Sequence, residues 1–180
     1  MKKFSGLEAS AVISSLLYTI LITYDIIWCW LFSFIGVILY LIICYRKRLY
    51  AESFLQIFYL ATTVYGFLNW GEGLSASPTE LSWNWHLSFI AAGAVLFGAA
   101  GYLLNRYSDA ATPYLDTFTT VFGILATLLM ILLYPSNWLY WIVIDGVSVY
   151  LYFQRGLWLS SGLFALYTLL SINGYWQWLN

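Results

Sequence analysis

Charge is scarce in this sequence. Only 8% of its 180 residues are charged, whereas 62% are hydrophobic and 21% are aromatic. A soluble domain of this size carries charge on roughly a quarter of its residues, which keeps its surface wet. The composition therefore excludes an ordinary water-soluble protein and predicts that lipid surrounds most of the chain.

Histidine and cysteine are almost absent as well. His86 is the only histidine, and the two cysteines are Cys29 and Cys44. If both cysteines lie on one helix, about 22 Å separates them at 1.5 Å per residue, so they cannot form a disulfide. No spacing typical of metal ligands occurs. We therefore expect no metal and no cofactor, and an intramembrane enzyme is only a remote alternative.

Apolar runs, by contrast, fill the chain. Seven stretches approach the roughly 20 residues that a helix needs to cross a membrane. Helices are the expected structure, because lipid cannot hydrogen-bond an open backbone. The expected fold is a single all-α transmembrane domain over 1–180, with helices at 7–23, 26–45, 49–70, 86–104, 114–133, 138–153 and 157–178.

Positive charge falls on one side of this predicted arrangement. If seven helices alternate in direction, every Lys and Arg lies at the N-terminus or in the connections 45–48, 105–113 and 154–156. Under the positive-inside rule, the N-terminus is then cytoplasmic and the C-terminus is outside. The opposite side holds no Lys or Arg and three acidic residues, Asp25, Glu72 and Glu80.

The chain also repeats itself. A shift of 108 residues aligns 48–70 with 156–178 without a gap, and six positions are identical. In the second helix of each half, a shift of 110 residues aligns Trp28 with Trp138, which indicates a small insertion there.

These alignments predict a 3+1+3 fold. A first three-helix repeat covers 1–70, a linker helix covers 86–104, and a second three-helix repeat covers 109–178. Three helices reverse the direction of the chain and the linker helix restores it, so the two halves run parallel. Parallel repeats of this kind occur in SWEET-type transporters.

Polar and aromatic residues recur on one face of the sixth predicted helix, at the spacings of three and four that make a helical stripe. The third predicted helix carries a similar stripe. Such faces cannot contact lipid, so we expect them to converge on a shared interior. The stripe members that we take as candidate site residues are Trp138, Trp141, Asp145 and Ser148 on the sixth helix and Gln56, Tyr59 and Thr63 on the third.

Asp145 differs from the other carboxylates within the helices. Glu8, Glu52 and Asp116 lie near predicted cytoplasmic helix ends, where a carboxylate reaches water or favours a helix N-terminus. Asp145 lies near the bilayer midplane, where an ionised group costs at least a few kcal/mol. No Lys or Arg lies at that depth, so Asp145 requires a water-filled cavity, a partner or a bound cation. Tryptophan rings beside it favour a cationic ligand, because a desolvated cation–π contact contributes about 2 kcal/mol.

Structural interpretations of the same residues stay open. Asp145 can be a protonated hydrogen-bond donor, and Trp138 can belong to the aromatic belt at the membrane interface. Gln56 and Thr63 can serve only to hydrogen-bond neighbouring helices.

Four motifs together resemble the PnuC family of bacterial vitamin transporters, and the resemblance runs from Glu8 to Trp178. They are IWCW (27–30), LYAESFLQIFYL followed by YGFLNW (49–70), DTFTT (116–120) and NWLYWIVIDGVSVYLY (137–152).

The resemblance implies a multi-pass protein of the bacterial inner membrane with a fold related to SWEETs. It implies uptake of a water-soluble vitamin by facilitated diffusion through a central site, followed by trapping by a cytoplasmic vitamin kinase. The residues matched to the family's binding positions are Gln56, the WxxW pair Trp138 and Trp141, Asp145 after that pair, and Asn173 on the seventh helix.

One departure within the family concerns the substrate. Carriers of nicotinamide riboside tend to have asparagine where this chain has Asp145, and aspartate is more similar to the thiamine branch, called PnuT. Both vitamins are flat and cationic. We therefore expect thiamine, closely followed by nicotinamide riboside.

The expected roles follow from the chemistry of these side chains. Trp138 and Trp141 stack on the vitamin, and Asp145 pairs with its charge. Gln56, Tyr59 and Asn173 hydrogen-bond it. The alternative mechanism makes Asp145 a proton carrier that couples uptake to the proton gradient.

Two further expectations concern motion and partners. Gly66 and Gly174, at matched positions in the two halves, are candidate hinges. The expected partners are the vitamin, the bilayer and, by function, the kinase; a homo-oligomer is an option, and nucleic acid is not expected.

Overall fold

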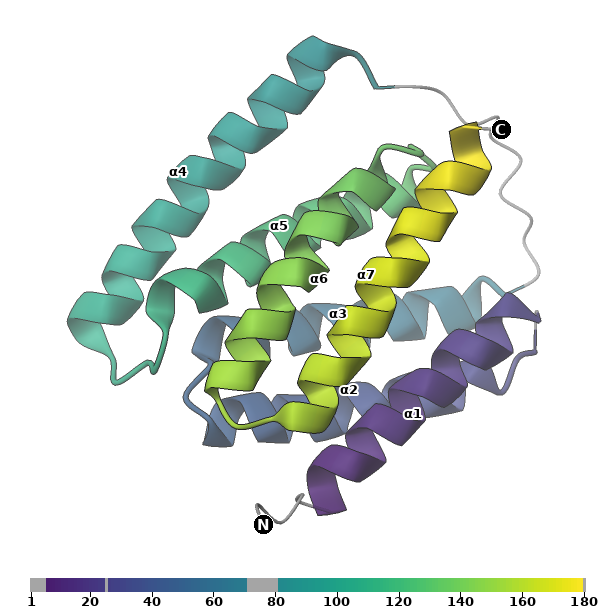
Figure 1. The fold of residues 1–180 in the computed structure, drawn as a ribbon, viewed down its shortest axis with the longest axis horizontal. Helices are drawn as coiled ribbons and strands as arrows, with labels where there is room; N and C mark the ends of the chain where they lie inside the picture. The colour runs from purple at the N-terminus through teal and green to yellow at the C-terminus, as the bar shows by residue number, and fades with distance from the viewer. Residues whose placement is uncertain (1–5, 25, 71–80, 180) are drawn as a thin grey trace.

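The computed structural model describes residues 6–24, 26–70 and 81–179 and consists of helices joined by short connections (Figure 1). The predicted number of seven helices is confirmed for this part of the chain. They are α1 (Gly6–Thr23), α2 (Cys29–Arg46), α3 (Tyr50–Leu68), α4 (Trp83–Tyr107), α5 (Pro113–Ile131), α6 (Asn137–Gln154) and α7 (Trp158–Leu179).

Local chemistry explains several of these boundaries. Pro113 occupies the first turn of α5, where a missing backbone N–H costs nothing. Arg48 and Gly156 follow α2 and α6 with φ of 59° and 71°, the left-handed conformation that ends a helix. The helix α4 extends beyond the predicted range 86–104 at both ends, because Trp83 and Tyr107 continue its hydrogen-bonded turns.

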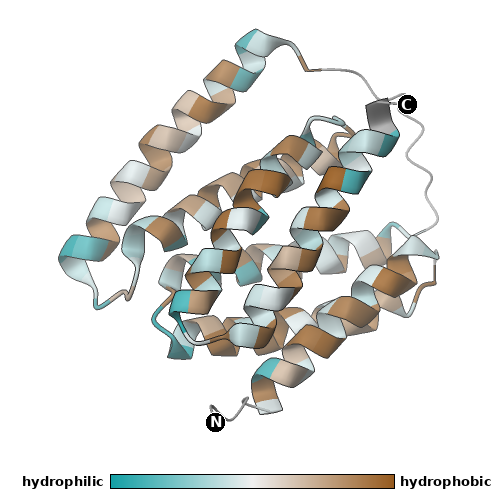
Figure 2. Cartoon of the chain, in the orientation of Figure 1, coloured by the Kyte–Doolittle hydropathy of each residue, from teal (hydrophilic) through white to brown (hydrophobic). Residues whose placement is uncertain are grey.

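Four of the seven described helices, α1, α2, α4 and α5, are long and apolar enough to cross a membrane alone. The helices α3, α6 and α7 fall short because polar side chains interrupt their apolar faces. Brown, hydrophobic segments run along the helices in Figure 2, and many large apolar side chains are exposed. Val95, for example, is 71% exposed. An apolar exterior of this extent is the surface that lipid would cover.

The helices form two groups of three. In the first group α2 packs against α1 and α3, and in the second group α6 packs against α5 and α7. The groups meet mainly along α3 with α5 and α1 with α7. The helix α4 lies along the edge of the bundle (Figure 1), where it packs mainly against α5 and contacts α6 through His86 and Tyr140.

Three connections meet at one end of the molecule, which we call the charged end. Lys47 Nζ donates to the Arg155 carbonyl at 3.0 Å, and an Arg155 guanidinium nitrogen donates to the Lys47 carbonyl at 2.8 Å. The backbone N–H of Ala111 donates to the Arg48 carbonyl at 3.0 Å. The connections after α2, α4 and α6 are thereby held together. The other charged residues used to predict orientation lie outside the described residues: Lys2, Lys3, Asp25, Glu72 and Glu80.

The register of 108 residues recurs in these contacts. The N–H of Leu49 donates to the Cys44 carbonyl, and the N–H of Leu157 donates to the Tyr152 carbonyl, both at 2.9 Å. Cys44 and Tyr152, themselves 108 residues apart, are in contact, with Sγ 3.5 Å from the hydroxyl.

The same register holds in the second helix of each group, so the predicted shift of 110 residues is wrong. Trp30 lies over Gly66, and Trp138 lies over Gly174. Trp28 is 64% exposed and lies over neither glycine. Packing over a glycine of the following helix, which Trp30 and Trp138 share, makes Trp30 rather than Trp28 the counterpart of Trp138.

Candidate substrate site

Asp145 lies inside the bundle, on the face of α6 that meets α7. It is 4% exposed, and Ser171 Oγ lies 3.5 Å from its Oδ2. Glu52, Tyr59 and Tyr167 are close enough to Asp145 for electrostatic interaction. Asp145 thus joins side chains of α3, α6 and α7 in one interior region.

No basic side chain neutralises this region in the part of the chain that the structure describes. The ion pair found there joins Arg48 Nε to Asp109 Oδ2 at 3.3 Å, on an exposed connection at the charged end. Glu52 adds a second buried carboxyl within electrostatic reach of Asp145. Asp145 and Glu52 therefore form no ion pair with a Lys or Arg of the described ranges.

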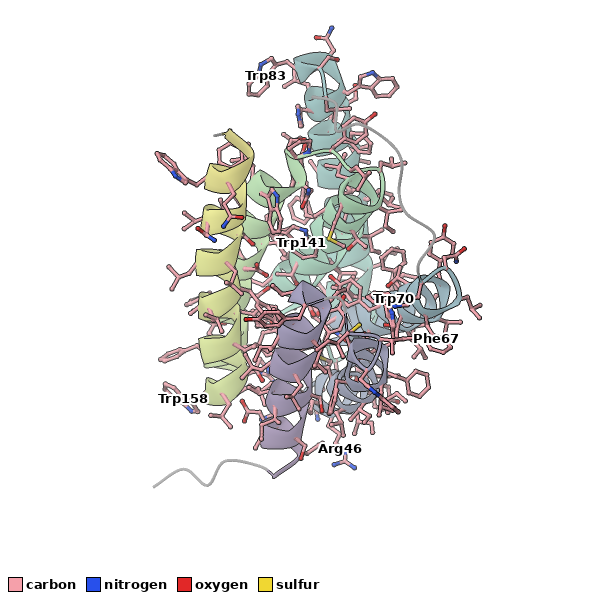
Figure 3. All side chains as sticks on the ribbon, turned by 90° about the vertical axis from the view of Figure 1, so that its right-hand side faces the viewer. Arg46, Phe67, Trp70, Trp83, Trp141 and Trp158 are labelled. Carbon is pink, nitrogen blue, oxygen red and sulfur yellow. The ribbon has the colours of Figure 1, made fainter. Side chains whose placement is uncertain are left out.

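The two predicted tryptophans lie about one and two turns before Asp145 on α6. Trp138 lies against α7: a Cβ added to Gly174 would be 2.8 Å from Cε2 of its indole. Trp141 packs against Phe122 and Ile144, between α5 and α6. Figure 3 shows Trp141 among the helices, whereas Trp83 and Trp158 lie toward the periphery. Both site tryptophans are thus held by packing.

The predicted residues of α3 differ in their surroundings. Gln56 and Thr63 are buried, and the Tyr59 hydroxyl lies 3.4 Å from the position of a Cβ on Gly123. Thr63 Oγ1 and Ser33 Oγ are 2.7 Å apart, so this hydroxyl already has a partner on α2. Ser33 is a member of the site region that the sequence search missed.

Ser148 and Asn173 have opposite outcomes. Ser148 is 2% exposed, three residues after Asp145 on the same face of α6. Asn173 lies on the exposed side of α7, away from Asp145, so the structure does not bring it to the other candidates. Ser171 takes that place, and its helical spacing from Gly174 and Tyr167 was the signal that could have identified it.

Gly66 and Gly174 have a packing function. A Cβ on Gly66 would lie within the Trp30 indole, and one on Gly174 would lie against Trp138. Both sites require glycine for close approach of an aromatic ring. Their role as hinges stays a prediction.

Three carboxylates near the charged end are buried, so of the two predicted settings, water and a helix N-terminus, water does not apply. Glu8, Glu52 and Asp116 are at most 3% exposed. Asp116 Oδ1 accepts from the N–H of Glu52 at 2.8 Å, and its Oδ2 accepts from the N–H of Ala51 at 3.0 Å. Glu8 Oε1 accepts from the N–H of Ser160 at 3.0 Å.

These carboxylates serve the alternative that was kept open, a favourable position at a helix N-terminus. The helix concerned belongs to the other group. Asp116 on α5 caps α3, and Glu8 on α1 caps α7. Glu52 in turn accepts from the hydroxyls of Thr119 and Tyr152, so it links α3 to α5 and α6.

A separate apolar cavity of about 350 Å³ opens between α4, α5 and α6. His86 and Tyr140 line it, with His86 Nδ1 2.9 Å from the tyrosine hydroxyl. Asp145 and both site tryptophans lie outside its lining. Across the described ranges no three His, Cys, Asp or Glu side chains are placed to hold a metal ion.

Known proteins resemble this chain over nearly its whole length. The model of a family described as nicotinamide mononucleotide transporter matches residues 5–180. The nicotinamide riboside transporter PnuC of Escherichia coli (strain K12) is 28% identical, with 98% of this chain and 86% of the relative covered. The protein of the same name from Neisseria mucosa is 28% identical, covering 97% and 72%.

A solved structure agrees in fold. The crystal structure of the vitamin B3 transporter PnuC superimposes on this chain with a TM-score of 0.72. The two chains are 28% identical, and the match covers 96% of this chain and 80% of that one.

Proposed function

The chain belongs to the nicotinamide mononucleotide transporter family, and we propose that it takes up thiamine by facilitated diffusion. Membership makes it a vitamin transporter rather than an enzyme, and a multi-pass protein of the inner membrane in bacteria. The choice of thiamine rests on the buried carboxyl of Asp145.

A fixed negative charge without a basic partner selects a cation. Asp145 is buried, and Glu52 lies within its electrostatic reach. An uncharged vitamin would leave both groups uncompensated. Thiamine carries a permanent positive charge on a flat ring, so it can pair with Asp145 and stack on Trp138 and Trp141.

Nicotinamide riboside is the second candidate. Relatives from Escherichia coli and Neisseria mucosa are named as transporters of this vitamin. It too is a flat cation with hydroxyl groups, so the same tryptophans and Asp145 suit it. A binding comparison between the two vitamins separates the candidates.

The remaining side chains divide the recognition of the vitamin. Gln56, Tyr59 and Ser148 offer hydrogen bonds around the ring, and Thr63 supports the site through Ser33. Asn173 contacts the vitamin only if α7 turns during transport, because it now lies on the exposed side of that helix.

Trapping in the cytoplasm completes the proposed uptake. A cytoplasmic kinase adds phosphate to the vitamin, and the product carries negative charge. That product cannot return past Asp145 and Glu52 at low cost, since like charges repel strongly in a poorly solvated interior. Facilitated diffusion then becomes net uptake without an ion gradient.

The proposal includes the arrangement in the membrane. All seven helices span it as 3+1+3 parallel repeats, with α4 as linker and the charged end in the cytoplasm. The contacts that recur at 108 residues support the repeat, among them the reciprocal bonds of Lys47 and Arg155. The described basic residues of the charged end support the orientation.

Calorimetric binding to purified protein tests the function. We expect thiamine to bind the wild type at least tenfold more tightly than Asp145→Asn, because a charge-assisted contact contributes about 1.5–3 kcal/mol. Asp109→Asn, which alters an exposed carboxyl at the charged end, should bind as the wild type does. Tighter binding of nicotinamide riboside, unchanged in Asp145→Asn, would contradict the thiamine assignment and favour the second candidate.

A further inference from the structure

Two buried indole N–H groups have no hydrogen-bond partner among the residues that the structure describes. They belong to Trp30 on α2 and Trp138 on α6, which are 108 residues apart. The two indoles also pack in the same way. Trp30 lies over Gly66 on α3, and Trp138 lies over Gly174 on α7. One unpaired donor can be an accident of packing, but two at equivalent positions indicate a common requirement.

An indole N–H can only donate, so its partner must be an acceptor. Buried polar groups are rarely left unpaired in native proteins, and an exception calls for an explanation. The ring contacts of Trp30 are with Tyr18, at 6.3 Å between ring centroids, and with Trp70, in an edge contact at 5.8 Å. Neither neighbour accepts a hydrogen bond from its indole N–H, so this donor is available to a ligand.

Trp30 lies close to a predicted site residue of α3. It precedes Ser33 by one helical turn on α2, and Ser33 Oγ is 2.7 Å from Thr63 Oγ1. Its indole also packs over Gly66, which follows Thr63 by one turn on α3. Trp30 therefore reaches the proposed vitamin site from α2.

The two groups offer different chemistry to a ligand. At the same register, α6 has Trp141 and Asp145 where α2 has Ser33 and Val37. Only α6 carries the acidic group that binds a cation. The feature common to both helices is the indole donor, which suits a neutral acceptor.

We infer that Trp30 is a specificity-determining residue that, together with Trp138, donates its indole N–H to a hydroxyl oxygen of the vitamin. Asp145 holds the cationic ring, and the indoles select a substrate that also has an alcohol. The inference rests on the proposed function, and it goes further in assigning a site residue on α2 and the substrate group that it recognises.

The test combines protein variants with a thiamine analogue in which hydrogen replaces the hydroxyl. We expect Trp30→Phe to weaken thiamine binding about fivefold or more, as loss of one hydrogen bond predicts. The same variant should bind the analogue within twofold of the wild type. Trp28→Phe, two residues away on an exposed side chain, should change neither affinity.

Several results would overturn the inference. Equal weakening of both ligands by Trp30→Phe would mean that the indole is only structural. A wild type that binds the analogue as tightly as thiamine would exclude hydroxyl recognition without any variant, even if Trp30→Phe failed to fold. A wild type that binds neither thiamine nor nicotinamide riboside would instead reject the proposed function.

Discussion

Two glycines fix the position of two tryptophans at the scale of single residues. The indoles of Trp30 and Trp138 occupy the space that a side chain at Gly66 or Gly174 would need. A small residue at these points therefore sets where each indole nitrogen lies. The proposed recognition of the substrate by the two tryptophans therefore requires that positions 66 and 174 have no side chain.

Gly174→Ala should disturb the packing of Trp138 against α7. The added methyl would lie 2.8 Å from the Trp138 ring, and overpacking of this kind costs about 1–3 kcal/mol. We expect a lower thermal midpoint in detergent and weaker thiamine binding, because Trp138 must move. Calorimetry and a thermal melt measure the two effects.

Gly162→Ala is the matched control on the same helix. Nothing lies within 4 Å of a Cβ added there, and alanine favours a helix by up to about 1 kcal/mol over glycine. This variant should keep thiamine binding and melt no earlier than the wild type. Equal thermal midpoints and equal thiamine binding in the two variants would argue against a packing role for Gly174.

Sequence patterns predicted most of the proposed site at this scale. The helical stripe on α6 suggested Asp145, Ser148 and the two tryptophans, because spacing alone places them on one face, and their role in binding stays a prediction. It did not suggest Trp30, since Trp28 precedes it by two residues and both are aromatic. Only packing against Gly66 separates them.

Asn173 illustrates the same limit. A match to the family's motif suggested it, but the rotation of α7 is set by contacts with α1 and α6. That rotation turns Ser171 toward Asp145 and Asn173 outward. A linear motif does not contain this information.

At the scale of elements, the first turns of two helices are capped by carboxylates from the other group of three helices. The first turn of α3 is capped by Asp116, and that of α7 by Glu8. The first N–H groups of a helix have no partner within it, so an external carboxylate is stabilising. Each capping contact also holds the two groups of helices together.

Asp116→Asn should weaken the contact between α3 and α5. Asparagine supplies one acceptor where Asp116 supplies two, so either Ala51 or Glu52 keeps an unpaired N–H. A buried unpaired donor costs about 1–3 kcal/mol. The measurement is the thermal midpoint of the purified protein without vitamin.

Asp109→Asn provides the comparison for this prediction. The hydrogen bond from the Tyr50 hydroxyl lowers the pKa of Asp109, but the group is exposed on a connection. Its replacement should change the midpoint far less than Asp116→Asn does. A midpoint for Asp116→Asn equal to that of the wild type would show that the cap contributes nothing.

The helices themselves were predictable, whereas their caps were not. Apolar runs and the polar breaks between them gave seven elements, with errors of a few residues at the ends. The capping pairs join residues 64 or 152 positions apart. No local pattern could connect them. These carboxylates are buried, so they occupy helix N-termini and do not reach water, which was the other predicted setting.

At the scale of the whole molecule, three connections meet at one end, and two of them, after α2 and α6, carry basic residues. Reciprocal bonds between Lys47 and Arg155 hold two of these connections together, and Arg48 bonds the third. The proposed orientation places this end in the cytoplasm. The two ends of α4 allow a direct check, because Ser82 and Ser108 flank it and are exposed.

Single cysteines at these serines should be labelled from opposite sides. In cells with an intact inner membrane, we expect a membrane-impermeant maleimide to label Ser82→Cys and not Ser108→Cys. Permeabilisation should expose Ser108→Cys. The native Cys29 and Cys44 are fully buried, so the wild type serves as the unlabelled control. The reverse pattern would place the charged end outside.

The capping contact between α1 and α7 also sets an order of events during synthesis. Glu8 is made near the start of translation, whereas Ser160, whose N–H donates to it, follows 152 residues later. The contact that joins the first and last helices therefore forms only once α7 has been made, and a chain that stops before α7 lacks it.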